Sequence, residues 1–208
     1  MPAHLTRLDV RDPRAAVLVL HGGKPRSERT VDRGSASWQR MAAMQRRLHP
    51  DWEDAGVSSW LLRYRARGWN AGHGSVDDAR WALSEVRREL GDVPVVLLGH
   101  SMGGRVAVHV ADDESVVGVV ALAPWWEPAD PVATLAGRRV VAAHGRRDRI
   151  TSFRMTEQYL ARARASGIDT TMVDMGLLGH YMLSGTQRWN DVALDATLAL
   201  ACEDRDPA

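Results

Sequence analysis

Short runs of apolar, mostly branched residues recur along the chain and alternate with segments of helical spacing. Residues 15–20 are apolar throughout and end at His21-Gly22-Gly23. Uninterrupted runs of this length are typical of strands buried on both faces of a parallel sheet. We expect further strands at 57–64, 93–98, 116–123, 139–143 and 170–175, and a short N-terminal strand within 4–10.

The intervening segments carry apolar residues three and four positions apart, which is the period of an amphipathic helix. The clearest stripe is Ala79, Leu83, Val86 and Leu90, behind Ser75 as the expected N-cap. Similar spacing predicts helices around 38–48, 155–163 and 189–200. Strands that alternate with helices imply crossovers packed on both faces, so we predict a three-layer α/β/α sandwich with a mostly parallel sheet.

Two stretches interrupt the alternation and are expected to be loops. Residues 24–35 are strongly polar, and residues 124–137 contain two tryptophans and three prolines. Neither is long enough to be a cap, so residues 1–208 are predicted to form one domain. Ligands of such sheets bind at the carboxyl ends of the strands, so functional residues should directly follow strands.

Composition narrows the possible functions. Hydrophobic residues make up 45% and charged residues 25% of the 208 positions, values that exclude a disordered chain. The single cysteine, Cys202, excludes an intramolecular disulfide framework and an all-cysteine zinc site. The sequence has no cluster with zinc-ligand spacing and no glycine-rich phosphate motif, so we expect no metal and no cofactor.

The charge balance also favours a small-molecule function. The net charge is +1, and the 26 arginines are scattered and offset by 26 acids, so only composition supports an arginine-rich nucleic-acid binder. No apolar run is long enough for a membrane span, and the N-terminus lacks a signal-peptide cleavage pattern. We expect a cytoplasmic monomer or homodimer with no nucleic-acid or membrane partner.

The segment Gly-His-Ser-Met-Gly-Gly at 99–104 carries the first chemical signal. A buried strand must turn sharply into a helix here, and the glycines remove side chains that would collide in the turn. Such a turn exposes Ser101 as a nucleophile and aims the Met102 amide at a developing oxyanion. His100 is expected to point away. The alternative is a glycine-rich turn that only permits close packing.

A serine hydroxyl becomes nucleophilic when a base accepts its proton. Of the eight histidines, His180 lies on a glycine-flanked loop directly after the last expected strand, from which it can reach Ser101. The imidazole needs a carboxylate partner, and Asp148 follows the preceding strand. Asp174 and Asp130 are alternative acids, and Asp148 could instead form a surface ion pair with neighbouring arginines.

The serine, aspartate and histidine occur in the order found in the α/β-hydrolase superfamily, which the chain resembles from about Ala15 to its end. The resemblance implies an α/β-hydrolase fold without a cap domain, a sheet of six or seven strands, and acyl transfer through an acyl-serine. The size is similar to uncapped esterases and the dienelactone-hydrolase-like group. Dienelactone hydrolases proper carry a cysteine where this chain has Ser101.

The superfamily's oxyanion loop matches His21-Gly22, which implies that the amide of Gly23, or alternatively Lys24, works beside Met102. We expect hydrolysis of small-molecule carboxylic esters by a Ser-His-Asp triad. A thioesterase or acyltransferase with the same triad is the nearest alternative, and a non-catalytic binding protein of this fold is the other. Candidate substrate contacts are Lys24, Trp125, Trp126 and one of Arg63, Arg65 and Arg67, although the tryptophans could seal their loop and the arginines could be solvated.

Overall fold

The structure is a computed structural model that describes residues 2–202. Its strands are β1 (His4–Leu8), β2 (Ala15–Leu20), β3 (Val57–Arg63), β4 (Val95–His100), β5 (Val116–Leu122), β6 (Arg139–His144) and β7 (Asp169–Asp174). Its helices are α1 (Ala36–Asp54), α2 (Ser75–Leu90), α3 (Met102–Val110), α4 (Phe153–Ala165) and α5 (Thr186–Ala201), with short 3₁₀ turns η1 (Asn70–Gly72) and η2 (Ala133–Leu135).

The described strands form one sheet in the order β1-β3-β2-β4-β5-β6-β7. β1 pairs antiparallel with β3, and every other pairing is parallel. All residues of β2 and β4 are buried, as expected for strands covered on both faces. The predicted mostly parallel sheet of six or seven strands is confirmed.

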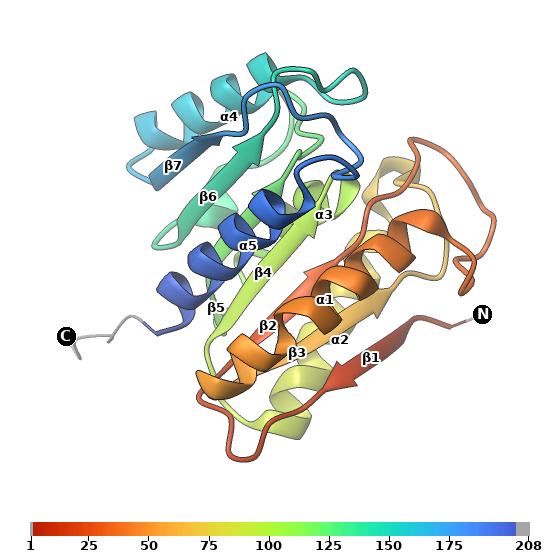
Figure 1. The fold of residues 1–208 in the computed structure, drawn as a ribbon, viewed down its shortest axis with the longest axis vertical. Helices are drawn as coiled ribbons and strands as arrows, with labels where there is room; N and C mark the ends of the chain where they lie inside the picture. The colour runs from red at the N-terminus through yellow and green to blue at the C-terminus, as the bar shows by residue number, and fades with distance from the viewer. Residues whose placement is uncertain (1, 203–208) are drawn as a thin grey trace.

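Helices cover both faces of the sheet, with α1 and α5 on one side and α2, α3 and α4 on the other (Figure 1). The side chains of β2 alternate between the two resulting cores, because successive residues of a strand point to opposite faces. Ala16, Leu18 and Leu20 pack with α2 and α3, whereas Ala15, Val17 and Val19 pack with α1 and α5. The three-layer sandwich is therefore also confirmed.

The local signals at element ends were less accurate. Ser75 is the first residue of α2 rather than its N-cap, which is Gly74. The N-cap was predicted one residue too late because serine is favoured at several positions near a helix start.

The polar segment 24–35 contains no helix or strand, as expected for a loop. Single bridges from Lys24 to Gly68 and from Thr30 to Ala66 bond it to the chain after β3.

The carboxyl ends of β2, β4, β6 and β7 meet at one edge of the sheet (Figure 1). The segment 124–137 after β5 is a loop that includes η2, as expected. Among residues 2–202, no helix has the length and apolar character needed to cross a membrane.

Candidate active site

Ser101 lies in a tight turn between β4 and α3. Its φ is +55°, a left-handed value that residues other than glycine rarely adopt. A Cβ added to Gly99 would lie 2.5 Å from the backbone of Gly103, and one added to Gly103 would collide with the carbonyl oxygen of Leu20. The flanking glycines are therefore required by the close approach of backbone segments.

The structure brings the three sequence-predicted side chains into one hydrogen-bonded chain. His180 Nε2 lies 3.0 Å from Ser101 Oγ, and His180 Nδ1 lies 2.7 Å from Asp148 Oδ2. Because a carboxylate can only accept, Nδ1 carries the imidazole proton and Nε2 is free to accept from the serine hydroxyl. Ser101 and His180 are each 6% exposed, and the Asp148 side chain is fully buried.

Asp148 is held by several donors besides His180. The amides of Ile150 and Thr151 each donate to Oδ1 at 2.8 Å, and the Thr151 hydroxyl lies 2.9 Å from Oδ2. His144 Nε2 also lies 3.1 Å from Oδ2. Burial alone would raise the pKa of Asp148, but the hydrogen bonds from His144, His180 and the two amides outweigh it and hold the pKa well below its usual range.

The alternative acids are engaged elsewhere. Asp174 is exposed and pairs with Arg146 at 2.7 Å. Asp130 is buried but pairs with Arg105 at 2.9 Å and with His109 at 3.1 Å. In residues 2–202 neither carboxylate bonds to the predicted base, and no arginine pairs with the aspartate that does.

Of the two candidate oxyanion donors in the loop after β2, the amides of Gly23 and Lys24, only the Gly23 amide is free to donate among the described residues. The amide of Lys24 donates to the carbonyl oxygen of Arg67 at 2.8 Å and is therefore occupied, whereas the Gly23 amide has no acceptor among the described residues. A Cβ on Gly23 would collide with the Met102 sulfur and lie 2.5 Å from that Arg67 oxygen. The backbone of Gly23 thus lies directly against Met102, where α3 presents its first amide.

His21 makes side-chain contacts that the sequence pattern did not indicate. Its Nδ1 donates to the carbonyl oxygen of Gly22 at 2.7 Å, and its Nε2 accepts from the Tyr64 amide at 3.4 Å. Burial lowers the pKa of His21 to about 4, with the Gly22 bond opposing the shift. The neutral ring therefore fixes the peptide that precedes Gly23, although the His-Gly pair suggested only a backbone donor.

His100 does not point away from the site as expected. It is 1% exposed, and its Nε2 donates to the carbonyl oxygen of His180 at 3.0 Å. The two imidazole rings lie 5.0 Å apart. Burial, followed by the charge of His180, lowers the pKa of His100 to about 3. His100 therefore holds the backbone that carries the predicted base.

The predicted substrate contacts lie in different environments. Trp126 is 2% exposed, donates to a backbone carbonyl of α3 and stacks on Tyr159 with ring centres 4.3 Å apart, which favours the packing interpretation. Trp125 is half-buried, and its amide donates to the carbonyl oxygen of Ser101 at 3.1 Å. The Lys24 side chain is exposed.

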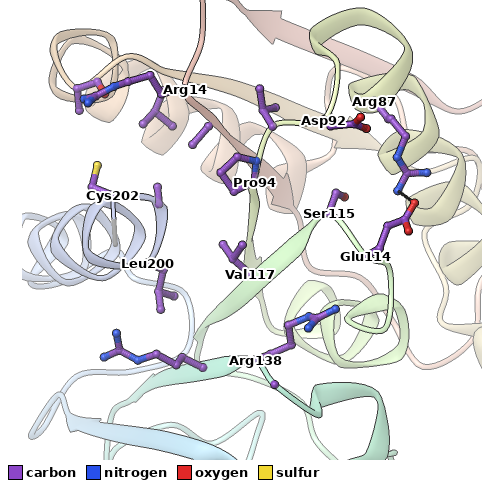
Figure 2. A pocket seen from close by; sticks show the side chains of 17 residues that line it. Arg14, Arg87, Asp92, Pro94, Glu114, Ser115, Val117, Arg138, Leu200 and Cys202 are labelled. Carbon is purple, nitrogen blue, oxygen red and sulfur yellow. Dashed lines mark hydrogen bonds and ion pairs between the residues drawn. The ribbon is translucent and has the colours of Figure 1, made fainter. Parts of the chain in front are cut away.

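A cavity of about 920 Å³ lies at the opposite edge of the sheet. Figure 2 shows it between Val117 and Pro94 at the amino ends of β5 and β4 and Leu200 and Cys202 at the end of α5. It contains none of the predicted site residues. Within residues 2–202, no three histidine, cysteine, aspartate or glutamate side chains gather as a metal site.

Comparison with known proteins places the chain in a family. The model of the Hydrolase_4 family, described as serine aminopeptidase, S33, matches residues 11–143. The match includes the loop after β2 and the turn that holds Ser101. No curated protein matches the chain.

Several solved structures share the fold. A serine hydrolase without a lid from Xanthomonas campestris has 16% identity and a TM-score of 0.72, with 97% of this chain and 91% of that chain covered. A thermophilic, butyrate-bound esterase from Thermogutta terrifontis has 18% identity and a TM-score of 0.70, with 97% and 92% covered. A serine hydrolase homologue from Coxiella burnetii has 16% identity and a TM-score of 0.69, with 93% and 90% covered. At these identities the likeness establishes the fold alone.

Proposed function

Because the chain belongs to the Hydrolase_4 family of serine hydrolases, described as serine aminopeptidase, S33, we propose that it hydrolyses carboxylic esters of small molecules through an acyl-serine intermediate. The observation that carries the proposal is the hydrogen-bonded chain from Ser101 through His180 to Asp148. Its distances of 3.0 Å and 2.7 Å fit transfer of the serine proton to a base held by a buried carboxylate.

In the proposed reaction, Ser101 Oγ attacks the acyl carbon while His180 Nε2 accepts the hydroxyl proton. Asp148 stabilises the imidazolium, and the amides of Met102 and Gly23 donate to the oxyanion. The tetrahedral intermediate collapses when His180 gives its proton to the leaving alcohol. Water then attacks the acyl carbon as His180 takes its proton, and Ser101 leaves with that proton restored.

Ester substrates fit the site better than the peptides that the family description suggests. An aminopeptidase must receive the ammonium group of its substrate, which calls for a carboxylate free to pair with it. The buried carboxylates at this edge, Asp148 and Asp130, already accept from histidine, arginine and backbone donors. The Thermogutta esterase, which shares this fold, is bound to butyrate, a small carboxylate.

The test compares 4-nitrophenyl butyrate, a butyryl thioester and alanine 4-nitroanilide with wild-type protein and Ser101→Ala. We expect the oxygen ester to have the highest kcat/KM and Ser101→Ala to lower it at least about 10,000-fold. A higher kcat/KM for the thioester would assign the chain as a thioesterase, and transfer to an added alcohol would assign it as an acyltransferase. Full ester turnover by Ser101→Ala would overturn the proposal.

A further inference from the structure

A second histidine, besides the predicted base, contacts Asp148. His144 ends β6, and its side chain is fully buried. Its Nε2 lies 3.1 Å from Asp148 Oδ2, the same oxygen that accepts from His180. Its Nδ1 lies 2.8 Å from the hydroxyl of Thr156 in α4, and the ring of Phe153 packs against it with centres 5.9 Å apart.

The chemistry of these groups fixes their protons. A carboxylate only accepts hydrogen bonds, so the proton of His144 lies on Nε2. Nδ1 is then an acceptor, and the Thr156 hydroxyl must donate to it. Thr156 is fully buried, so water does not compete for this bond. The hydroxyl of Thr156 thereby sets which tautomer of His144 faces Asp148.

We propose that His144, oriented by Thr156, is a positioning residue for the reaction proposed above, on which this inference rests. It holds Asp148 Oδ2 in line with His180 and shares the negative charge of that oxygen. Without this donor the charge would concentrate on the bond to His180 and stabilise the imidazolium in the resting protein. The Thr151 hydroxyl is a further polar neighbour, 3.4 Å from His144 Nε2 and 2.9 Å from the carboxylate, in addition to the amides of Ile150 and Thr151.

The test uses Thr156→Val, which removes the hydroxyl at nearly constant volume, with Thr156→Ser as the matched control and His144→Phe as a second variant. We expect Thr156→Val and His144→Phe to lower kcat about 10-fold or more and to move the acidic limb of the kcat/KM profile to higher pH, whereas Thr156→Ser retains the wild-type profile. Urea unfolding of each variant reports any loss of stability separately.

A wild-type pH profile in folded Thr156→Val would overturn the inference, even if its stability falls, because a merely structural contact would not move the profile. Failure of the proposed function would look different. In that case wild-type protein would hydrolyse no ester at any pH.

A separate observation concerns the charge of the substrate. Of the three arginines that were candidates for a carboxylate contact, Arg65 pairs with Asp78, and Arg67 pairs with Asp32 at 2.8 Å. Arg63 ends β3 and has no acid partner among the described residues, but it forms no hydrogen bond or ion pair with a site residue there either. Arg40 of α1 has no such partner. No carboxylate in residues 2–202 pairs with it, and its Nε is buried without a hydrogen bond.

Arg40 lies beside Tyr181, the residue that follows the predicted base. Its guanidinium carbon is 5.3 Å from the ring centre of Tyr181, and that ring is 5.4 Å from the ring of His180. Arg40 also acts electrostatically on His100, which precedes the nucleophile. Burial lowers the pKa of Arg40, as expected for a cation removed from water without a counter-charge. A half-buried guanidinium without a counter-charge in residues 2–202 is available to pair with an anion from outside the chain.

We infer that Arg40 receives a carboxylate of the substrate, so that the preferred esters are monoesters of dicarboxylic acids. This inference also rests on the proposed function. Guanidinium binds carboxylate through charge-assisted hydrogen bonds, which distinguish an anionic ester from a neutral one of the same length. Stacking on Tyr181 limits the motion of the guanidinium and lowers the entropic cost of binding.

The test compares the 4-nitrophenyl monoester of adipic acid with 4-nitrophenyl hexanoate. We expect wild-type protein to prefer the adipate monoester and Arg40→Leu to lower the ratio of the two kcat/KM values about 10- to 100-fold. Arg46→Leu removes an exposed arginine of the same helix and should leave the ratio unchanged. An unchanged ratio in Arg40→Leu would overturn the inference, whereas failure of the proposed function would leave both esters intact in wild-type protein.

Discussion

Two neighbouring loops at the carboxyl edge of the sheet each bury an aspartate, but the two carboxylates have different partners. Asp148 lies in the loop between β6 and α4, and Asp130 lies in the loop after β5. The loops touch where the hydroxyl oxygen of Thr151 lies 3.2 Å from the carbonyl oxygen of Ala123. Both carboxylates follow strands of one sheet, so position along the fold does not separate them.

The partners do separate them. Asp130 pairs with Arg105, whose guanidinium lies 4.6 Å from both Trp69 and Trp125 and so ties three chain segments together. Among the described residues, Asp148 accepts only from uncharged hydroxyl and amide donors and from two imidazoles. An arginine neutralises a carboxylate, whereas neutral donors keep it ionised and leave its field to act on a histidine. A buried aspartate therefore braces a loop in one case and can orient a base in the other.

Asp148→Asn tests the catalytic half of this contrast and should have the largest effect. An amide in place of the carboxylate would present an N–H or a weak acceptor to His180 and favour the wrong tautomer. We expect kcat/KM for the ester to fall about 10,000-fold. Steady-state kinetics measures the loss, and circular dichroism checks that the variant folds.

Asp130→Asn tests the structural half. It would leave Arg105, whose side chain is 11% exposed, as a buried cation without a counter-charge. We expect a loss of about 3–5 kcal/mol in the free energy of unfolding, measured with urea, and less than about a tenfold change in kcat/KM. Equal losses of activity in the two asparagine variants would contradict the distinction between the loops.

Gly23→Ala leaves both loops intact and disturbs the opposite side of the site. The added Cβ would collide with the Met102 sulfur and the Arg67 carbonyl, so the backbone must shift. Loss of one oxyanion donor should lower kcat about 100-fold. Gly74→Ala is the matched control, because a Cβ there meets nothing within 4 Å. A wild-type kcat for Gly23→Ala would remove Gly23 from the proposed oxyanion site.

The buried histidines and Asp148 should affect the free energy of unfolding in different pH ranges. The pKa values of His21 and His100 are lowered from 6.5 to about 4 and about 3, so the unfolded chain binds more protons than the folded one below pH 6.5. The two histidines therefore leave the free energy of unfolding unchanged above pH 6.5 and lower it as the pH falls toward 4. The loss is up to about 1.4 kcal/mol per pH unit for each histidine. The depressed pKa of Asp148 adds a loss only below about pH 4.

Urea unfolding at pH 7.5, 6.0 and 5.0 measures this dependence. His100→Gln should flatten the slope between pH 6.5 and 5, because one of the two groups that bind protons on unfolding is gone. An equally steep slope in His100→Gln would show that its burial does not control the acid sensitivity of the fold.

The sequence was most informative where a local pattern has one structural solution. The run at 15–20 became β2 without a shift in its bounds, and the glycines around Ser101 predicted the turn in which it lies. Asp148 and His180 could be chosen because residues after parallel strands meet at one edge.

Contacts that cross layers left no local signal. His144 and Thr156 are twelve residues apart in β6 and α4 and meet only when the helix packs on the sheet. The His100 ring points toward the carbonyl oxygen of His180, to which it donates. Arg40 has no carboxylate partner in residues 2–202, because the fold places the acidic side chains elsewhere. Periodicity and turn motifs predict single helices, strands and turns. They do not predict which side chains meet when those elements pack together.

The most direct test of the central claim, that His180 and Asp148 activate Ser101, is labelling with a fluorophosphonate followed by intact-mass analysis. We expect one adduct on wild-type protein, none on Ser101→Ala and a strongly reduced rate on His180→Ala. His109→Ala provides a control at a histidine bonded to the other aspartate and should label like wild type. An adduct that persists in Ser101→Ala, or none on folded wild-type protein, would contradict the account.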